Sequence, residues 1–272
     1  MNMTNLAEKA VELREWIIRA LASAGSGHPG GSLSAIDILT VLYYQEMEIT
    51  LENYDQKDRD HFILSKGHAA PALYTVLADE GFFHKEELLD LRKFGCHLQG
   101  HPDRIKTRGV DTSSGSLGQG LSIANGLALA KRLDGIEKNV YILLGDGELQ
   151  EGQVWEAAMT AAHYKLNNVI AFVDNNGLQI DGTNDEVMGV QDIGKKFAAF
   201  NWKVLTANGH DFDSLTAAIG KAKAYDGGPT VIVCETHKGK GVSFMEDQVG
   251  WHGKAPSQEE ADQALAELKE AF

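Results

Sequence analysis

The central part of the chain constrains the fold most, because it predicts two strands joined by one helix. Residues 140–144 are a short apolar, partly β-branched run, a Gly-Asp-Gly sequence at 145–147 interrupts it, and residues 154–163 carry apolar side chains at helical spacing. A second apolar run at 168–173 ends at Asp-Asn-Asn-Gly, 174–177, residues that tolerate tight turns. A strand, a crossover helix and another strand predict two parallel strands that end side by side.

Two oxygen-bearing residues, Asp146 and Asn176, follow these strands thirty positions apart. Ligands of an open parallel sheet bind beyond the carboxyl ends of its strands, so both residues should face one crevice. A carboxylate, an amide oxygen and a nearby backbone carbonyl suit Mg²⁺, which keeps few protein ligands and completes its octahedron with phosphate oxygens. Two ordinary turns would explain the same residues, because Gly, Asp and Asn are the commonest turn residues.

This pair resembles the thiamine diphosphate motif, in which the Asp and the second Asn hold the metal on the diphosphate of the cofactor. The segments GHPGG, SKGHAAPALY, GSLGQG and GDGELQEG look like the amino-terminal, diphosphate-binding domain of transketolase, in that family's order along the chain. The resemblance covers nearly all 272 residues. It implies thiamine diphosphate, Mg²⁺ with Ca²⁺ or Mn²⁺ as substitutes, and transfer of a two-carbon ketol unit from a ketose phosphate to an aldose phosphate.

The composition agrees with a single domain over residues 1–272: 43% hydrophobic and 24% charged residues are ordinary globular usage. A net charge of −14 without a Lys/Arg cluster argues against a nucleic-acid partner. The two cysteines lie far apart, which predicts neither a disulfide framework nor a metal site. The chain has no leader-like amino terminus and no apolar run near the eighteen or so residues of a membrane span. We therefore expect a cytoplasmic protein with no membrane partner.

Strand and helix patterns alternate along most of the chain. This alternation predicts an α/β fold with an open, mostly parallel sheet of about five strands and helices on both faces. A glycine-rich segment at 25–31 is expected to be a loop, with Ser34 capping the helix that follows. The predicted strands are residues 61–64, 140–144, 168–173, 202–206 and 230–234.

Four histidines stand beside glycines or at a strand end. His28, His101 and His252 each adjoin glycine or a Gly-Pro turn, and His68 follows Lys66 at the start of a helix, where backbone amides favour an anion such as a diphosphate. By resemblance, His28 and His101 contact the substrate and His68 binds the diphosphate. A loop histidine is ordinarily a solvated surface residue, and a solvated side chain explains Lys66 equally well.

The resemblance assigns roles to the remaining site residues. Glu151 and Glu156 match positions near a dimer interface that are thought to carry protons between active sites, although charged residues at a helix start are most often helix-dipole partners. Lys238 lies in a glycine-rich basic loop, which is flexible in the simplest interpretation. The implied cofactor contacts are Lys66, His68, Gly115, Ser116, Leu117, Gly147, Asn176, Gln179, Lys238 and His252; the metal ligands are Asp146, Asn176 and Leu178; and the catalytic candidates are His28, His68, His101, His252 and Glu151.

The sequence ends where the transketolase family continues into a pyrimidine-binding and a carboxyl-terminal domain. Those domains carry the glutamate that activates the aminopyrimidine and most arginines that bind the sugar phosphate. We therefore expect the amino-terminal subunit of a split transketolase, two copies of it with two of a carboxyl-terminal partner. The alternatives are part of a deoxyxylulose phosphate synthase-like enzyme, part of a 2-oxo acid dehydrogenase E1 and a non-catalytic scaffold. GHPGG, SKGH and QGHPD together weigh against the first two, and intact Asp146, Asn176 and His68 against the third.

Overall fold

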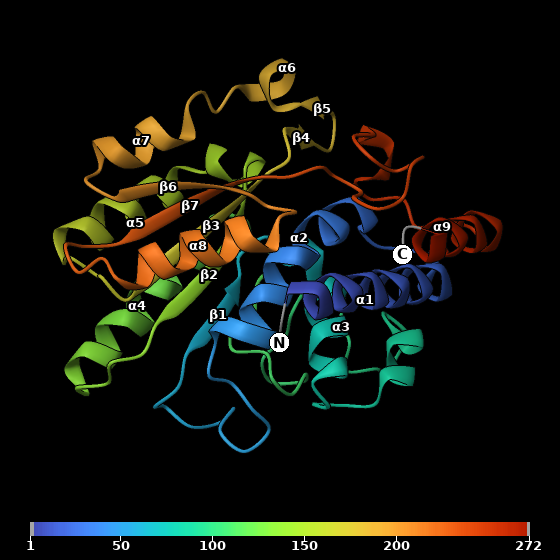
Figure 1. Cartoon of the computed structure of the whole chain (residues 1–272), viewed down its shortest axis with the longest axis horizontal. Coiled ribbons are helices and arrows are strands. Elements are labelled where there is room, and N and C mark those ends of the chain that lie inside the picture. The colour runs from blue at the N-terminus through green and yellow to red at the C-terminus, as the bar shows by residue number, and fades with distance from the viewer. Residues whose placement is uncertain (1–2, 271–272) are drawn as a thin grey trace.

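The computed structural model describes residues 3–270, and one open sheet organises them (Figure 1). The strand order is β1-β2-β3-β7-β6, and every neighbouring pair in this sheet is parallel. The structure thus confirms the predicted mostly parallel sheet. Its strands are β1 (His61–Leu64), β2 (Val140–Gly145), β3 (Val169–Asn175), β6 (Lys203–Asn208) and β7 (Thr230–Glu235).

Alternate side chains of the central strands feed two apolar layers, one on each face of the sheet. Tyr141 and Phe172 belong to the layer formed with α1 (Met3–Ala24), α2 (Pro29–Val41), α3 (Ala70–Asp79), α8 (Phe212–Lys223) and α9 (Gln258–Glu270). Ile142 and Ala171 belong to the other layer, formed with α4 (Gly120–Leu133), α5 (Gly152–His163) and α7 (Ile193–Ala199). Helices on both faces are therefore confirmed.

Short elements connect the main ones and shape the carboxyl edge of the sheet. They are the π-helix Leu42–Glu46, the 3₁₀ turns Gly67–Ala69, Lys85–Asp90, Gly147–Gln150 and Val249–Trp251, the antiparallel pair β4 (Leu178–Gln179) and β5 (Gly182–Thr183), and α6 (Asn184–Met188). Within residues 3–270, no helix is both long and apolar enough to span a bilayer.

Helix α2 begins at Pro29, so the prediction that Ser34 caps it was wrong. Proline at the first helical position has a backbone angle already suited to a helix, and its missing N–H costs nothing there. Gly31 lies inside this helix and packs closely on His68: a Cβ at position 31 would lie 3.2 Å from Nε2 of His68. Ser34 is buried one turn further on, and its hydroxyl donates to Asp174 at 2.6 Å.

Candidate active site

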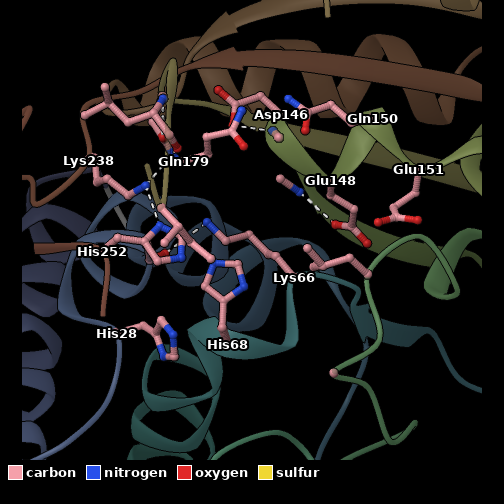
Figure 2. Close-up of a pocket in the computed structure, with 18 of the residues that line it drawn as sticks. His28, Lys66, His68, Asp146, Glu148, Gln150, Glu151, Gln179, Lys238 and His252 are labelled. Carbon is pink, nitrogen blue, oxygen red and sulfur yellow. Dashed lines mark hydrogen bonds between the residues drawn. The ribbon is translucent and has the colours of Figure 1, made fainter. Parts of the chain in front are cut away.

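A cavity of about 290 Å³ opens at the carboxyl edge of the sheet, beyond the ends of β1, β2, β3 and β7 (Figure 2). Lys238 and the labelled histidines lie on one side of it, Asp146, Glu148 and Glu151 lie on the other, and Lys66 lies between them. All the predicted site residues except Ser116 and Glu156 line it: His28, Lys66, His68, His101, Gly115, Leu117, Asp146, Gly147, Glu151, Asn176, Leu178, Gln179, Lys238 and His252. Ser116 borders a separate groove on the same loop. Unpredicted lining residues are Gly31, Gly145, Glu148, Gln150 and Ile180.

The carboxylate of Asp146 has the environment of a metal ligand. It is 3% exposed, and its oxygens accept the backbone N–H groups of Gly147 at 2.7 Å and Gly177 at 2.5 Å. Among residues 3–270, no cationic side chain forms an ion pair with it. Burial, followed by the charge of Asp174, raises the pKa of Asp146 to about 6. A bound divalent cation would offset both effects.

The other two predicted metal ligands follow β3: Asn176 comes directly after that strand, and Leu178 is the first residue of β4. Oδ1 of Asn176 accepts the N–H of Leu178 at 3.2 Å, and its Nδ2 donates to Asp174 at 3.3 Å. The carbonyl of Leu178 accepts a hydrogen bond from Nζ of Lys238 at 2.7 Å. No group of three or more His, Cys, Asp or Glu side chains in the described chain could hold a metal. The donor set that fits Mg²⁺ is therefore one carboxylate with amide and carbonyl oxygens.

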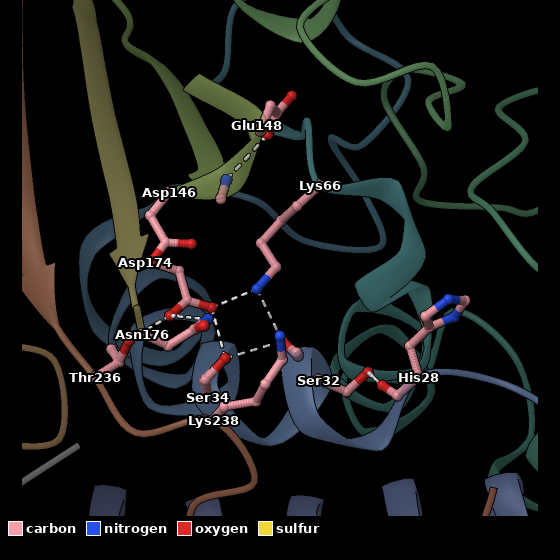
Figure 3. A network of polar contacts seen from close by, with 12 residues as sticks. His28, Ser32, Ser34, Lys66, Asp146, Glu148, Asp174, Asn176, Thr236 and Lys238 are labelled. Carbon is pink, nitrogen blue, oxygen red and sulfur yellow. Dashed lines mark hydrogen bonds and ion pairs between the residues drawn. The ribbon is translucent and has the colours of Figure 1, made fainter. Parts of the chain in front are cut away.

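Lys66 forms a buried ion pair with Asp174 (Figure 3). Both side chains are almost fully buried, and the Lys66 ammonium also donates to the carbonyl of Gly31 at 3.1 Å. The lysine that the sequence suggested for the diphosphate is therefore already paired. The sequence analysis treated Asp174 only as a turn residue. The signal that it missed was a second carboxylate at a strand end: Asp174 pairs with Gly145 in the register of β2 and β3, and Gly145 directly precedes Asp146.

Three histidines from separate segments meet in the cavity. The ring centroids of His28 and His68 lie 5.2 Å apart, those of His28 and His252 5.5 Å, and those of His68 and His252 5.2 Å. Burial, reinforced by nearby cations, lowers the pKa of His28 to about 4 and of His252 to about 3, and lowers that of His68 well below its ordinary value. All three rings are therefore neutral near pH 7, when each can both donate and accept a hydrogen bond.

In two of these rings, the surroundings of Nδ1 indicate what this nitrogen can do. Nδ1 of His28 is buried and has no hydrogen-bond partner among the described residues, as expected of an atom that a ligand satisfies. Nδ1 of His252 lies 2.9 Å from Nζ of Lys238. Because an ammonium only donates, this nitrogen is the acceptor, and the proton of the neutral His252 ring is on Nε2.

His101 and Gly115 both line the cavity, and the His101 ring packs against Gly115. A Cβ on Gly115 would lie 3.1 Å from Cγ of His101, and the φ of Gly115 is +148°, so both the close contact and the backbone favour glycine here. Partial burial and the nearby charge of Arg92 lower the pKa of His101. The loop that the resemblance assigned to the cofactor therefore also positions a histidine.

Glu148 is a buried carboxylate that sequence reasoning missed. It accepts hydrogen bonds from the Ser65 hydroxyl, from the N–H of Gly118 at 2.9 Å and from the N–H of Gly145 at 3.0 Å. It thereby ties the loop before α4 to the ends of β1 and β2. Glu151, in contrast, is exposed at the start of α5 on the rim of the cavity.

Comparisons with known proteins identify the family. Residues 7–270 match the family model described as transketolase, thiamine diphosphate binding domain. The 6-deoxy-6-sulfo-D-fructose transketolase subunit of Clostridium sp. strain MSTE9 is 41% identical over 265 residues, 97% of this chain and 96% of that protein. An apulose-4-phosphate transketolase subunit of Phocaeicola vulgatus is 37% identical over 270 residues, 99% of this chain and 96% of that protein.

Longer transketolases match through one part of their length. Human transketolase is 42% identical over 267 residues, which are 97% of this chain and 42% of that protein. The crystal structure of Campylobacter jejuni transketolase superimposes with a TM-score of 0.93 at 33% identity, covering 99% of this chain and 43% of that one. These relatives confirm the predicted resemblance to one subunit of a thiamine diphosphate-dependent transketolase. The chain therefore belongs to the family of transketolase thiamine diphosphate-binding domains.

Proposed function

We propose that this chain is the thiamine diphosphate- and Mg²⁺-binding subunit of a transketolase that moves a two-carbon ketol unit from a ketose phosphate to an aldose phosphate. The observation that carries the proposal is that one cavity is lined both by Asp146 and Asn176, whose side-chain oxygens suit a metal, and by three neutral histidines. The relatives named above are all transketolases, which favours this function over deoxyxylulose phosphate synthase or a 2-oxo acid dehydrogenase.

The cavity residues divide the work of holding the cofactor. Asp146, Asn176 and the Leu178 carbonyl would hold Mg²⁺, and His68, beside the amides that begin the helix after β1, would meet the diphosphate. Lys66 would act through its fixed positive charge, since its ammonium is bonded to Asp174. When bound, thiamine diphosphate supplies an electron sink for cleaving a carbon–carbon bond beside a ketone.

The histidines would handle the hydroxyl groups of the donor sugar. The unpaired Nδ1 of His28 can accept a hydrogen bond from a donor hydroxyl, and the Nε2–H of His252 can donate one. His101, on the cavity rim, can do either because it is neutral at pH 7. Neutral imidazoles near the reacting atoms suit proton transfer in both directions of a reversible group transfer.

A second polypeptide completes the proposal. Two relatives that match this chain end to end are named as subunits, and the C. jejuni transketolase chain is more than twice as long as the region that matches. We infer a cytoplasmic assembly of two copies of this chain with two of a carboxyl-terminal subunit, whose own residues would bind the pyrimidine end of the cofactor and the sugar phosphate. Glu151 and Glu156, both exposed on or near α5, would lie at the interface between the two copies.

The test is reconstitution from separately purified subunits. This chain is mixed with the purified product of the neighbouring gene, and ketol transfer is assayed with and without thiamine diphosphate and Mg²⁺. We expect either polypeptide by itself to be inactive and the mixture to gain activity that saturates near equal molar amounts. If this chain alone, free of partner by mass spectrometry, turned over ketose phosphate at about 1 s⁻¹ or faster, the two-subunit proposal would be wrong.

A further inference from the structure

We propose that Asp174 positions the metal ligand Asn176 and is not itself a ligand. The inference rests on the metal site of the proposed function. Two buried carboxylates, Asp146 and Asp174, stand at the ends of adjacent strands, where the N–H of Asp146 donates to the carbonyl of Asp174 at 3.2 Å. Their surroundings show which one is free to bind a cation.

Every acceptor position of Asp174 is occupied (Figure 3). Its side chain is 0% exposed, one oxygen accepts from the Ser34 hydroxyl at 2.6 Å and from the Lys66 ammonium, and the other accepts from the Thr236 hydroxyl and from Nδ2 of Asn176 at 3.3 Å. A carboxylate has about four lone-pair sites, so these four donors saturate it. Asp174 has nothing left to offer a metal in the cavity.

Asp146 has the opposite arrangement. Two backbone N–H groups, those of Gly147 and Gly177, hold its two oxygens, and each oxygen keeps a lone pair. Its side chain lines the cavity, whereas Asp174 is not among the lining residues. The two carboxylates therefore have separate tasks, one as ligand and one as support.

The support acts on the amide of Asn176. Its Nδ2 donates to Asp174 and its Oδ1 accepts the N–H of Leu178, so both neighbours demand the same orientation. A flipped amide would place oxygen against a carboxylate and NH₂ against an N–H, losing both bonds. The amide oxygen is thereby held ready as a ligand, with one lone pair free on a residue that lines the cavity.

Separate segments of the chain fix Asp174 itself. Ser34 comes from α2, Lys66 from the turn after β1 and Thr236 from the segment after β7. Lys66 supplies the charge that a fully buried carboxylate needs, and the two hydroxyls fix its rotation. Metal ligands are commonly oriented by such outer-shell groups, whose loss costs about 10- to 100-fold in metal affinity.

The experiment compares Mg²⁺ and Ca²⁺ binding to the assembled complex at saturating thiamine diphosphate, by calorimetry, in Asp174→Asn and Thr236→Val. We expect Mg²⁺ affinity to fall about 10- to 100-fold in the first variant and less in the second, which removes one of the hydroxyls holding the carboxylate. Mg²⁺ demands near-ideal octahedral geometry and Ca²⁺ does not, so the ratio of Mg²⁺ to Ca²⁺ affinity should fall as well. Thr75→Val is the matched control, because its buried hydroxyl donates to the carbonyl of Pro71 within α3, away from the cavity.

Three outcomes would overturn the inference. Mg²⁺ affinity within about twofold of wild type in both variants would show that Asn176 needs no support. An equal loss for Mg²⁺ and Ca²⁺ would reveal general damage rather than a misplaced ligand. A wild-type complex without Mg²⁺-dependent cofactor binding would overturn the proposed function and this inference together. If Asp174→Asn does not fold, Thr236→Val decides alone, since it leaves no unpaired charge.

Discussion

Two buried polar clusters lie beside α2 and differ in how completely their groups are paired. In the paired cluster (Arg14, Asp37 and His210), the Arg14 guanidinium donates twice to Asp37, at 2.9 and 2.6 Å, and Nδ1 of His210 bonds to Asp37 at 2.7 Å. Nε2 of His210 in turn accepts the N–H of His237 at 2.9 Å. In the cavity, Asp146 has no cationic partner and His28 has an unpaired nitrogen among the described residues.

The pKa values show what complete pairing achieves. Burial alone would raise the pKa of Asp37, but the charge of Arg14 and hydrogen bonds from His210 and Arg14 outweigh it and hold that pKa at about 2. Burial and the charge of Asp174 raise the pKa of Asp146 to about 6, because the N–H groups of Gly177 and Gly147 and the charge of Lys66 offset them only in part. An unpaired buried group lowers stability unless a ligand satisfies it. The paired cluster therefore stabilises the fold, whereas under the proposed function the unpaired cavity groups would gain their partners from the metal and the donor sugar.

The largest effect should come from removing the open carboxylate. We predict that Asp146→Ala lowers metal-dependent cofactor affinity by more than about 100-fold, because it removes a direct ligand where outer-shell groups alone contribute about 10- to 100-fold. Asn176→Ala should act in the same direction. Calorimetry of the assembled complex measures the affinity, and chemical denaturation should show no loss of fold stability. Undiminished affinity in both variants would remove the metal site.

The histidines of the cavity should affect turnover rather than binding. We predict that His28→Ala and His101→Ala each lower turnover by about ten- to ten-thousand-fold, the range for groups that transfer protons or polarise the donor, with little change in cofactor affinity. His163→Ala is the control, since that ring is exposed at the end of α5. Wild-type rates with several donors would mean that neither histidine takes part in catalysis.

Substitutions in the paired cluster should lower the stability of the fold, whereas substitutions in the cavity should lower cofactor binding or turnover. We predict that Arg14→Met lowers the free energy of unfolding by about 3–5 kcal/mol, because it leaves Asp37 buried without its cation. Arg104→Met, at an exposed position, is the control. Denaturant titration measures both variants. If Arg14→Met loses no more unfolding free energy than the control, the paired cluster does not stabilise the fold.

These contrasts mark how far the sequence could predict the site. The pairing of β2 with β3, and hence the approach of Asp146 to Asn176, follows from short-range patterns and one topological rule. The role of Asp174 does not, because its partners Ser34, Lys66 and Thr236 lie 140, 108 and 62 positions away. The start of α2 was mispredicted for a related reason: its glycines suggest a loop until the packing of His68 against Gly31 is known. Ser116 was assigned by resemblance and lies outside the cavity.

The smallest predicted effect is a difference in pH dependence between the two clusters. The pKa of His28 falls from 6.5 to about 4 on folding, so between these values the unfolded chain binds a proton that the folded chain does not. The stability linked to His28 is therefore complete above about pH 6.5 and is lost as the pH falls towards 4. The contribution of Asp37 stays intact over that window, because its depressed pKa places its loss between about 3.8 and 2.

The pH prediction separates the clusters with one measurement. In His28→Gln, the free energy of unfolding should fall less steeply than in wild type as the pH is lowered from about 6.5 to about 4. Other cavity groups also contribute: the lowered pKa of His252 adds slope in the same direction, and the raised pKa of Asp146 adds slope in the opposite direction between about 6 and 3.8. Asp37→Asn should keep the wild-type slope in this window and differ only at lower pH. Denaturant titrations at a series of pH values test both variants. A wild-type slope in His28→Gln would mean that the pKa of His28 is the same in the folded and unfolded chains. The assignment of a neutral His28 to the donor sugar would then be wrong.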